Sequence, residues 1–125
     1  VIDTTDPEDT GIDIYIGTGG APEGVLAAAA LRCVGGQMLG RLILDTDEKL
    51  SRAGRMGIDD PRRIYSVMDM ASGDVLFAAT GVTDGNMLAG VRFARNYIQT
   101  ETIVMRSRSQ TIREITARHL DMDKF

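Results

Sequence analysis

The 125-residue sequence has no tryptophan, a single cysteine and only 5% aromatic residues. One cysteine cannot form a disulfide within the chain, and without a CxxC pair no zinc ribbon is available. We therefore expect a reducing compartment, namely the cytoplasm. With so few aromatic residues, the core must be filled by aliphatic residues, alanine and the seven methionines, which favours packed layers of helix and sheet.

Long apolar runs and an excess of positive charge are also missing. The longest apolar stretch, 25–31, is far shorter than the ~20 residues that a bilayer span needs. The formal net charge of -4 makes the whole molecule a poor partner for nucleic acid or anionic membrane, so we predict neither partner. A composition of 43% hydrophobic and 26% charged residues is ordinary for a globular protein, and we expect one core without an internal domain boundary.

The residue patterns predict a succession of short elements, as in an α/β fold. Strands are expected at 12–16, 37–44, 63–67, 74–79, 91–94 and 100–106, and helices at 23–34, 45–56 and 111–120. A brief helical or loop segment is expected to follow the strand 63–67 through Met70. The Ala-rich helix 23–34 is apolar on nearly every face, so it is expected to lie buried between layers. Helix 45–56 is expected to be capped by Asp45 or Thr46 and ended by Gly57.

The segment 17–24, Gly-Thr-Gly-Gly-Ala-Pro-Glu-Gly, joins a predicted strand to a predicted helix. Such a junction offers unpaired backbone N–H groups and the positive end of a helix dipole, which together can hold a phosphate without a basic side chain. Pro22 stands where the GxGxxG fingerprint needs glycine, and Val25 stands where the Walker motif needs lysine. The segment is therefore a candidate phosphate-binding turn that is neither a dinucleotide fingerprint nor a P-loop.

Glu23 falls in the first turn of the helix, and two interpretations of it are open. An acid at this position is commonly only a helix-start charge, stabilised by the dipole by about 0.3 to 1 kcal/mol. Alternatively, its carboxylate supplies an oxygen ligand to a divalent ion that also touches a phosphate on the turn. No second acidic cluster with ligand spacing accompanies it, because the early acids lie in a solvated leader: Asp3, Asp6, Glu8 and Asp9.

Other chemically interesting residues are expected to have structural roles. His119 is predicted to have a cationic or C-terminal capping role near the end of the last helix, and Cys33 to pack in the core. Thr80, Thr83 and Asp84 follow a strand and could line a ligand, but a cap or turn role is favoured. A basic region, expected to be a solvated face although it could meet an anion or an acidic partner, is formed by Arg106, Arg108, Arg113 and Arg118.

Four blocks of the sequence follow one another in the order found in a known family. The segment 16–25 resembles the signature of the class II, GlpX-type, fructose-1,6-bisphosphatases, and the blocks 29–42, 74–85 and 100–113 are similar to later parts of that family. The resemblance covers essentially the whole chain. It implies the layered α/β sandwich of the sugar and inositol phosphatase superfamily, with a mixed sheet flanked by helices.

The function implied by this resemblance is a metal-dependent hydrolase. Members remove the 1-phosphate of fructose 1,6-bisphosphate in gluconeogenesis, and some also accept sedoheptulose 1,7-bisphosphate. The implied cofactor is Mn²⁺ or Mg²⁺, and Glu23 matches a metal-binding glutamate of the family. Gly20 matches a glycine whose backbone contacts the sugar phosphate, and we expect the neighbouring Gly19 and Thr18 to bind substrate with it.

The resemblance further implies that residues 1–125 are the C-terminal half of a longer enzyme. The other metal carboxylates, the catalytic threonine and the basic substrate residues belong to an N-terminal half, so no catalytic residue is expected here and this segment alone should be inactive. The full-length chain is expected to be a homo-oligomer. Two alternatives are a non-catalytic module that binds sugar phosphates and a structural half that packs on a partner chain.

Overall fold

The computed structural model describes residues 1–121, which form two compact units. The first unit consists of Val1–Arg32 and Gly36–Gly73, and the second consists of Cys33–Gly35 and the described residues from Asp74 onward. The expectation of one core was therefore wrong. Among the described helices, none combines the length and the apolar character needed to span a membrane.

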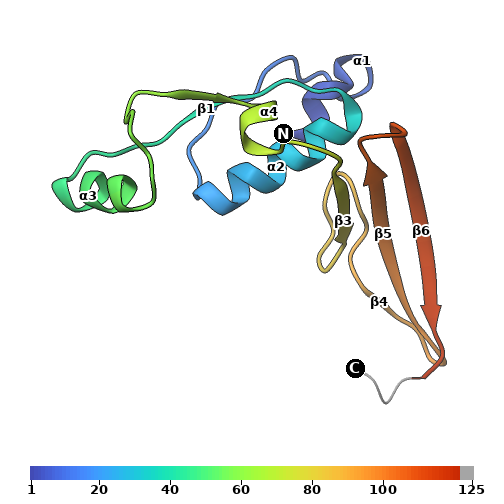
Figure 1. The fold of residues 1–125 in the computed structure, drawn as a ribbon. Helices are drawn as coiled ribbons and strands as arrows, with labels where there is room; N and C mark the ends of the chain where they lie inside the picture. Colours follow the sequence, from blue (N-terminus) through green and yellow to red (C-terminus); the bar gives the residue numbers. More distant parts are fainter. Residues whose placement is uncertain (122–125) are drawn as a thin grey trace. The chain divides into compact units, whose positions relative to one another are not determined.

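The first unit holds short helices and a two-stranded antiparallel sheet (Figure 1). In this sheet, Gly40 of β1 lies opposite Tyr65 of β2. The elements of the unit are η1 (Ile2–Thr5), α1 (Pro7–Thr10), most of α2 (Ala21–Val34), β1 (Leu39–Arg41), α3 (Asp47–Arg55), β2 (Ile64–Ser66) and α4 (Val67–Met70).

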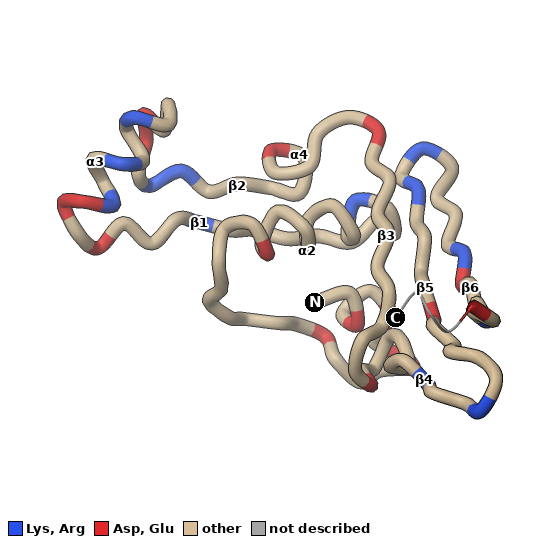
Figure 2. The backbone as a smooth tube through the Cα atoms, turned by 90° about the horizontal axis from the view of Figure 1, so that it is seen from below, with Lys and Arg blue, Asp and Glu red and all other residues tan. Residues whose placement is uncertain are grey.

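Local sequence signals determine where α3 and α4 begin. The Thr46 hydroxyl accepts a hydrogen bond from the Lys49 N–H at 3.2 Å, which confirms the predicted cap of α3. Gly57 follows this helix with a φ of 82°, a backbone conformation that glycine adopts without strain. α4 begins with a capping box between Ser66 and Asp69. Charges of both signs lie along α3, as expected for a solvent-facing helix (Figure 2).

α2 is exposed at its start and buried towards its end. It begins at Ala21, two residues before the predicted start, and Leu26 in its first half is 59% exposed. The prediction of a helix buried along its whole length was therefore wrong for this first half. The buried side chains of α2 lie in its second half: Ala28, Ala30, Leu31 and Cys33.

The second unit is built on a four-stranded sheet (Figure 1). β5 is its central strand: β3 and β4 pair with one edge of β5, and β6 pairs with the other. Every strand pairing in the described residues is antiparallel, in place of the mixed sheet that was expected, while the combination of helices and sheets itself is confirmed. The strands are β3 (Leu76–Thr80), β4 (Arg92–Phe93), β5 (Ile98–Arg106) and β6 (Thr111–His119).

The last element is a strand, and the prediction of a helix over 111–120 was wrong. Ile112 and Ile115 have a spacing that also suits one face of a helix, which led to the error. The same segment is rich in β-branched residues, which favour strands, and a turn at 107–110 brings it back along β5. Pairing with β5 at nine positions therefore decides its conformation.

The segment 12–16 does not form the predicted strand. Residues 11–20 carry no regular secondary structure and are exposed, with Ile14 at 73% and Ile16 at 87% exposure. An alternating pattern becomes a strand only when a neighbour satisfies its backbone groups, and no strand in the described part of the chain pairs with this segment. The other five predicted strands are found, with shifted ends, as β1 to β5.

The two faces of the sheet in the second unit differ in burial. Ile103 and Met105 of β5 are 6% and 1% exposed, and their partners on β3 are Ala79 and Phe77. On the opposite face, Leu76 is 69% exposed. The face that carries Ile103 and Met105 is therefore buried beside β3, while on the other face the buried residue of β5 is Ile98, which is 2% exposed.

Candidate functional site

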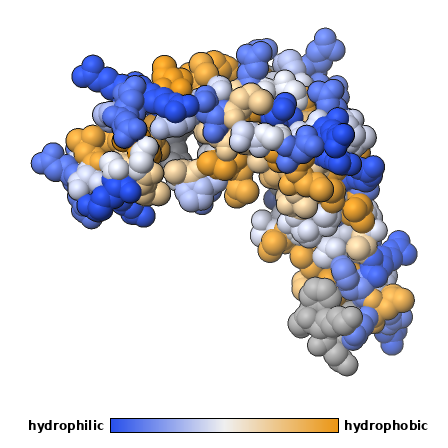
Figure 3. Space-filling model, viewed as in Figure 1, coloured by the Kyte–Doolittle hydropathy of each residue, from blue (hydrophilic) through white to orange (hydrophobic). Residues whose placement is uncertain are grey.

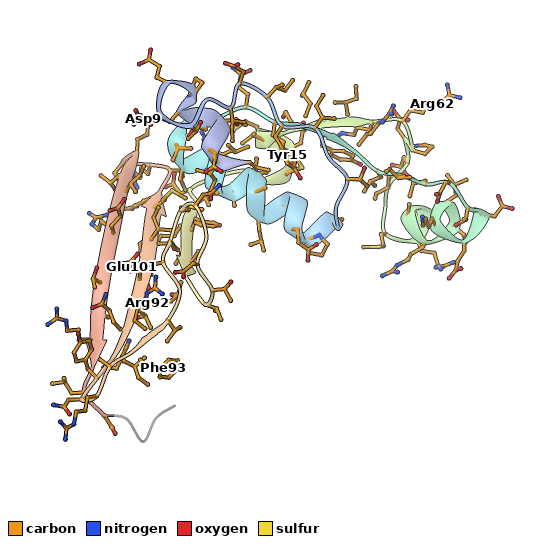
Figure 4. The ribbon with its side chains drawn as sticks, turned by 180° about the vertical axis from the view of Figure 1, so that it is seen from behind. Asp9, Tyr15, Arg62, Arg92, Phe93 and Glu101 are labelled. Carbon is orange, nitrogen blue, oxygen red and sulfur yellow. The ribbon has the colours of Figure 1, made fainter. Side chains whose placement is uncertain are left out.

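The candidate site is centred on the glycine turn, which we define as residues 17–20. The whole turn is exposed, and so is Glu23. Tyr15, labelled in Figure 4, folds back over the turn: a Cβ added to Gly17 would lie 2.7 Å from the Tyr15 hydroxyl. The turn is thus a solvent-facing backbone segment that a ligand can reach.

The start of α2 leaves polar backbone groups pointing at the glycine turn. The first intrahelical hydrogen bond runs from the Gly24 N–H to the Gly20 carbonyl, at 3.0 Å. The N–H groups that precede Gly24 in the first turn have no carbonyl of this helix to bind, and Pro22 has no N–H at all. Because the positive end of the helix dipole lies at the same place, this helix start favours an anion.

Glu23 lies in the first turn of α2, as predicted, and its side chain folds back over Gly20. A Cβ added at position 20 would collide with Glu23 Oε2 and lie 3.2 Å from its Cδ. A Cβ added at Gly19 would meet nothing within 4 Å. The carboxylate therefore occupies the space that a side chain at position 20 would fill, beside the backbone of the glycine turn.

The chemistry of Glu23 suits a hard divalent cation, because Mg²⁺ and Mn²⁺ prefer carboxylate oxygens. One carboxylate cannot complete a coordination shell. Within residues 1–121, no three histidine, cysteine or acidic side chains come close enough together to hold a metal ion. The described residues thus provide one fitting ligand and leave the rest of the shell to other groups.

The second candidate loop, 80–91, is held together by its own polar groups. The Asp84 carboxylate accepts hydrogen bonds from the Gly90 N–H at 2.9 Å and from the Arg92 guanidinium at 2.7 Å. The bond from Gly90 is the main cause of the lowered pKa of Asp84, and the charge of Arg92 adds to it. Thr80 is hydrogen-bonded to Thr102 at 2.8 Å on the adjacent strand. Asp84 therefore stabilises the turn of its own loop, the role that the sequence favoured over ligand binding.

Glu101 is a loop-bracing residue that the sequence did not reveal. Its Oε2 accepts a hydrogen bond from the Ala89 N–H at 3.0 Å. Figure 4 shows Glu101 on β5 and Arg92 on β4, both beside this loop. No local motif marks Glu101, because its partner is a backbone group that lies 12 residues away in the sequence.

The structure changes the role expected for His119. It lies on β6, where its ring Nε2 is hydrogen-bonded to the Thr100 hydroxyl at 3.0 Å, so the predicted helix cap was wrong. Cys33 is buried as predicted, and its thiol donates to the Val75 carbonyl at 3.8 Å. Both side chains contribute to the second unit.

The arginines of the predicted basic region do not all lie on one face of the sheet. Arg113 and Arg118 lie an odd number of residues apart on β6 and so lie on opposite faces of the sheet. Arg113 donates to the Thr111 hydroxyl at 3.2 Å, and Arg118 stacks 5.1 Å from the centre of the Tyr97 ring. Because these two arginines have separate partners, they support the expected solvated face rather than an anion site.

Comparison with known proteins shows similarity to one family. The family model described as bacterial fructose-1,6-bisphosphatase, glpX-encoded, matches residues 1–119. The chain is 43% identical over 124 residues to the D-fructose 1,6-bisphosphatase class 2/sedoheptulose 1,7-bisphosphatase of Synechococcus sp. (strain JA-3-3Ab), a match that covers 89% of this chain and 36% of the relative.

Two further relatives carry the same class of name. The protein of Crocosphaera subtropica (strain ATCC 51142 / BH68) is 41% identical, with the same coverage. That of Acaryochloris marina (strain MBIC 11017) is 40% identical over 128 residues, covering 92% of this chain and 37% of the relative. The chain therefore spans little more than a third of the length of the curated relatives that it matches.

Proposed function

This chain belongs to the bacterial, glpX-encoded fructose-1,6-bisphosphatase family, and we propose on that premise that its glycine turn and Glu23 form one part of a sugar-bisphosphatase site. The proposed reaction is hydrolysis of the 1-phosphate of fructose 1,6-bisphosphate, with sedoheptulose 1,7-bisphosphate as a second substrate. We place it in gluconeogenesis in the cytoplasm, with Mn²⁺ or Mg²⁺ as cofactor. The proposal assigns residues 1–125 to the C-terminal half of the enzyme, which acts as a homo-oligomer.

The observation that carries this proposal is the position of the Glu23 carboxylate over Gly20 at the start of α2. The backbone of Thr18, Gly19 and Gly20 would hold a substrate phosphate, aided by the helix dipole. Glu23 would hold the metal next to that phosphate. A bound divalent cation would neutralise charge that develops on the transferred phosphoryl group. The phosphate and the metal would then both be bound beside the same short stretch of backbone.

The test is the exchange Glu23→Gln in a full-length enzyme that contains this segment. Glutamine has nearly the same shape but lacks the anionic oxygen that a hard cation prefers, so we expect turnover supported by Mn²⁺ to fall on the order of tenfold to a hundredfold or more. Phosphate release is measured across a Mn²⁺ titration. Because Glu23 is exposed, the melting temperature should change little.

Glu48→Gln is the matched control for this experiment. Glu48 also lies in the first turn of a helix, α3, and is also exposed. The exchange removes the same charge from the first turn of a helix, so it reports the effect of a helix-start charge alone. If Glu23→Gln changed turnover and apparent Mn²⁺ affinity no more than Glu48→Gln does, Glu23 would be only a helix-start charge.

A second proposal concerns the 125-residue chain by itself, which we expect not to hydrolyse the bisphosphate. Positioning and charge neutralisation supply nearly all of the catalysis in phosphoryl transfer, and Glu23 alone cannot fix a metal and an attacking water. Phosphate release above a metal-only control and proportional to protein concentration would contradict this. Calorimetry with fructose 1,6-bisphosphate separates the alternatives: binding without release favours a binding module, and no binding favours a structural half.

A further inference from the structure

β6 forms an edge of the sheet in the second unit. Among the described residues it pairs only with β5, at nine consecutive positions from Thr111 to His119. Its side chains are largely exposed, with Ile112 at 54% and Ile115 at 45%. Both hydrophobic and hydrophilic side chains are exposed along the hairpin of β5 and β6 (Figure 3). An unpaired edge of this length is a template for another strand.

The hydrogen bonds of β5 show which backbone groups of β6 are unused. The Ser107 N–H donates to the Val75 carbonyl, and the Gly81 N–H donates to the Glu101 carbonyl. Odd-numbered residues of β5 therefore bond towards β3, and even-numbered ones bond towards β6. Since the register pairs even-numbered residues of β5 with odd-numbered residues of β6, the groups directed away from the sheet belong to Ile112, Glu114, Thr116 and Arg118.

The sequence of β6 lacks the devices that usually protect an edge. It contains no proline, glycine or lysine, and its register against β5 runs without interruption from one end to the other. Its charged side chains are Arg113, Glu114 and Arg118, which carry both signs. Such charges would repel another strand only if like charges came to lie opposite each other.

We propose that β6 pairs antiparallel with β6 of a second copy of this chain, about a twofold axis at Thr116. In this register Glu114 lies opposite Arg118 of the second copy, and the symmetry makes this pair twice. Ile112 lies opposite Leu120 of the second copy, and Leu120 is 76% exposed in the single chain. The unused backbone groups of Ile112, Glu114, Thr116 and Arg118 are those that the two strands would exchange.

The neighbouring registers lack this charge complementarity. An axis at Ile115 places Glu114 opposite Thr116, and an axis at Ala117 places Glu114 opposite Leu120. An axis at Glu114 brings two glutamates together, which is unfavourable. Only the register about Thr116 puts both members of the Glu114 and Arg118 pair opposite unlike charges.

Sedimentation equilibrium of the purified 125-residue chain tests the proposal, and we expect a dimer. Glu114→Arg and Arg118→Glu, made singly, each convert the two attractive pairs of the dimer into two repulsive ones, so the dimer Kd should rise on the order of tenfold or more. An equimolar mixture of the two variants should dimerise again, because every pair in the mixed dimer is attractive. Arg113→Glu is the control of matched charge change, since the register does not place Arg113 opposite an acid.

Recovery in the mixture separates pairing from damage to the fold. Arg118 also stacks on Tyr97, so a loss of dimer in Arg118→Glu alone could reflect a disturbed hairpin. A disturbed hairpin would not be repaired by mixing with Glu114→Arg. The proposal is overturned by a wild-type chain that stays monomeric at about 100 μM, by single variants that dimerise as the wild type does, or by a mixture that stays monomeric.

Discussion

Replacing Gly90 by alanine should destabilise the second unit strongly, because the added methyl group has no space. The new Cβ would lie 2.7 Å from the Thr83 carbonyl carbon and 2.8 Å from the Asp84 nitrogen. Both are backbone atoms, which cannot rotate away as the end of a side chain can. The loop is fixed by bonds from the Val91 N–H to the Val82 carbonyl and from the Gly90 N–H to the Asp84 carboxylate.

The size of the effect follows from the cost of overpacking. Forcing an extra methyl group into a closely packed site costs about 1–3 kcal/mol, and here the displaced atoms would also weaken the bond from Gly90 to Asp84. A loss of about 2 kcal/mol is a large part of the ~5–15 kcal/mol that stabilises a typical domain. For a domain of 60–100 residues it corresponds to a melting temperature lower by roughly 8–16 °C.

Gly85→Ala is the control in the same loop. A Cβ added to Gly85 would meet only the Leu88 carbonyl oxygen, at an ordinary distance of 3.8 Å. Thermal unfolding followed by far-UV circular dichroism suits both variants, because the chain has no tryptophan to report on folding. If Gly90→Ala and Gly85→Ala melted within about 1 °C of each other, a difference under ~0.3 kcal/mol, the close approach of the loop backbone would be refuted.

Two further predictions concern stability. Met105→Ala should lower the free energy of unfolding by about 2–5 kcal/mol, because Met105 is 1% exposed. Urea unfolding checks this prediction: the midpoint of Met105→Ala should lie below that of Leu76→Ala, a variant at an exposed position. Asp69 has a pKa lowered mainly by the hydrogen bond from Ser66, so its contribution to stability is present above its ordinary value near 3.8 and is lost as the pH falls through the lower folded pKa. Asp69→Asn should therefore destabilise the protein at pH 7, and its urea-midpoint difference from the wild type should shrink as the pH is lowered below 3.8. A difference that stays constant as the pH falls would assign the effect to something other than the carboxylate.

Helix boundaries could be predicted from sequence where the deciding contacts are local. The cap of α3 joins Thr46 to a residue three positions later, and Gly57 ends it through its own φ. The place of Glu23 in the first turn of α2 follows from the same kind of short-range signal, although the helix begins two residues earlier than predicted. These features need no partner from elsewhere in the chain.

Strands depend on partners that the pattern does not specify. The segment 12–16 alternates as a strand should, but no described strand pairs with it. The segment 111–119 has a spacing that suits a helix, but β5 lies beside it. For the same reason Glu101 could not be recognised as a brace of the loop 80–91, since its contact with Ala89 exists only after β5 is in place.

The order of strand pairing in the second unit sets the order in which it can fold. β5 and β6 are joined by the turn 107–110, so their hairpin closes a very short loop, and hairpins of this kind form in about 1–10 μs. Thr80 and Thr102 pair across 22 residues, and closing that longer loop costs more chain entropy. The hairpin is thus the natural nucleus, and β3 is the strand that docks late. Until it docks, the part of β5 from Thr102 to Arg106 has no partner on that edge, so slow docking of β3 would expose this unit to aggregation during synthesis.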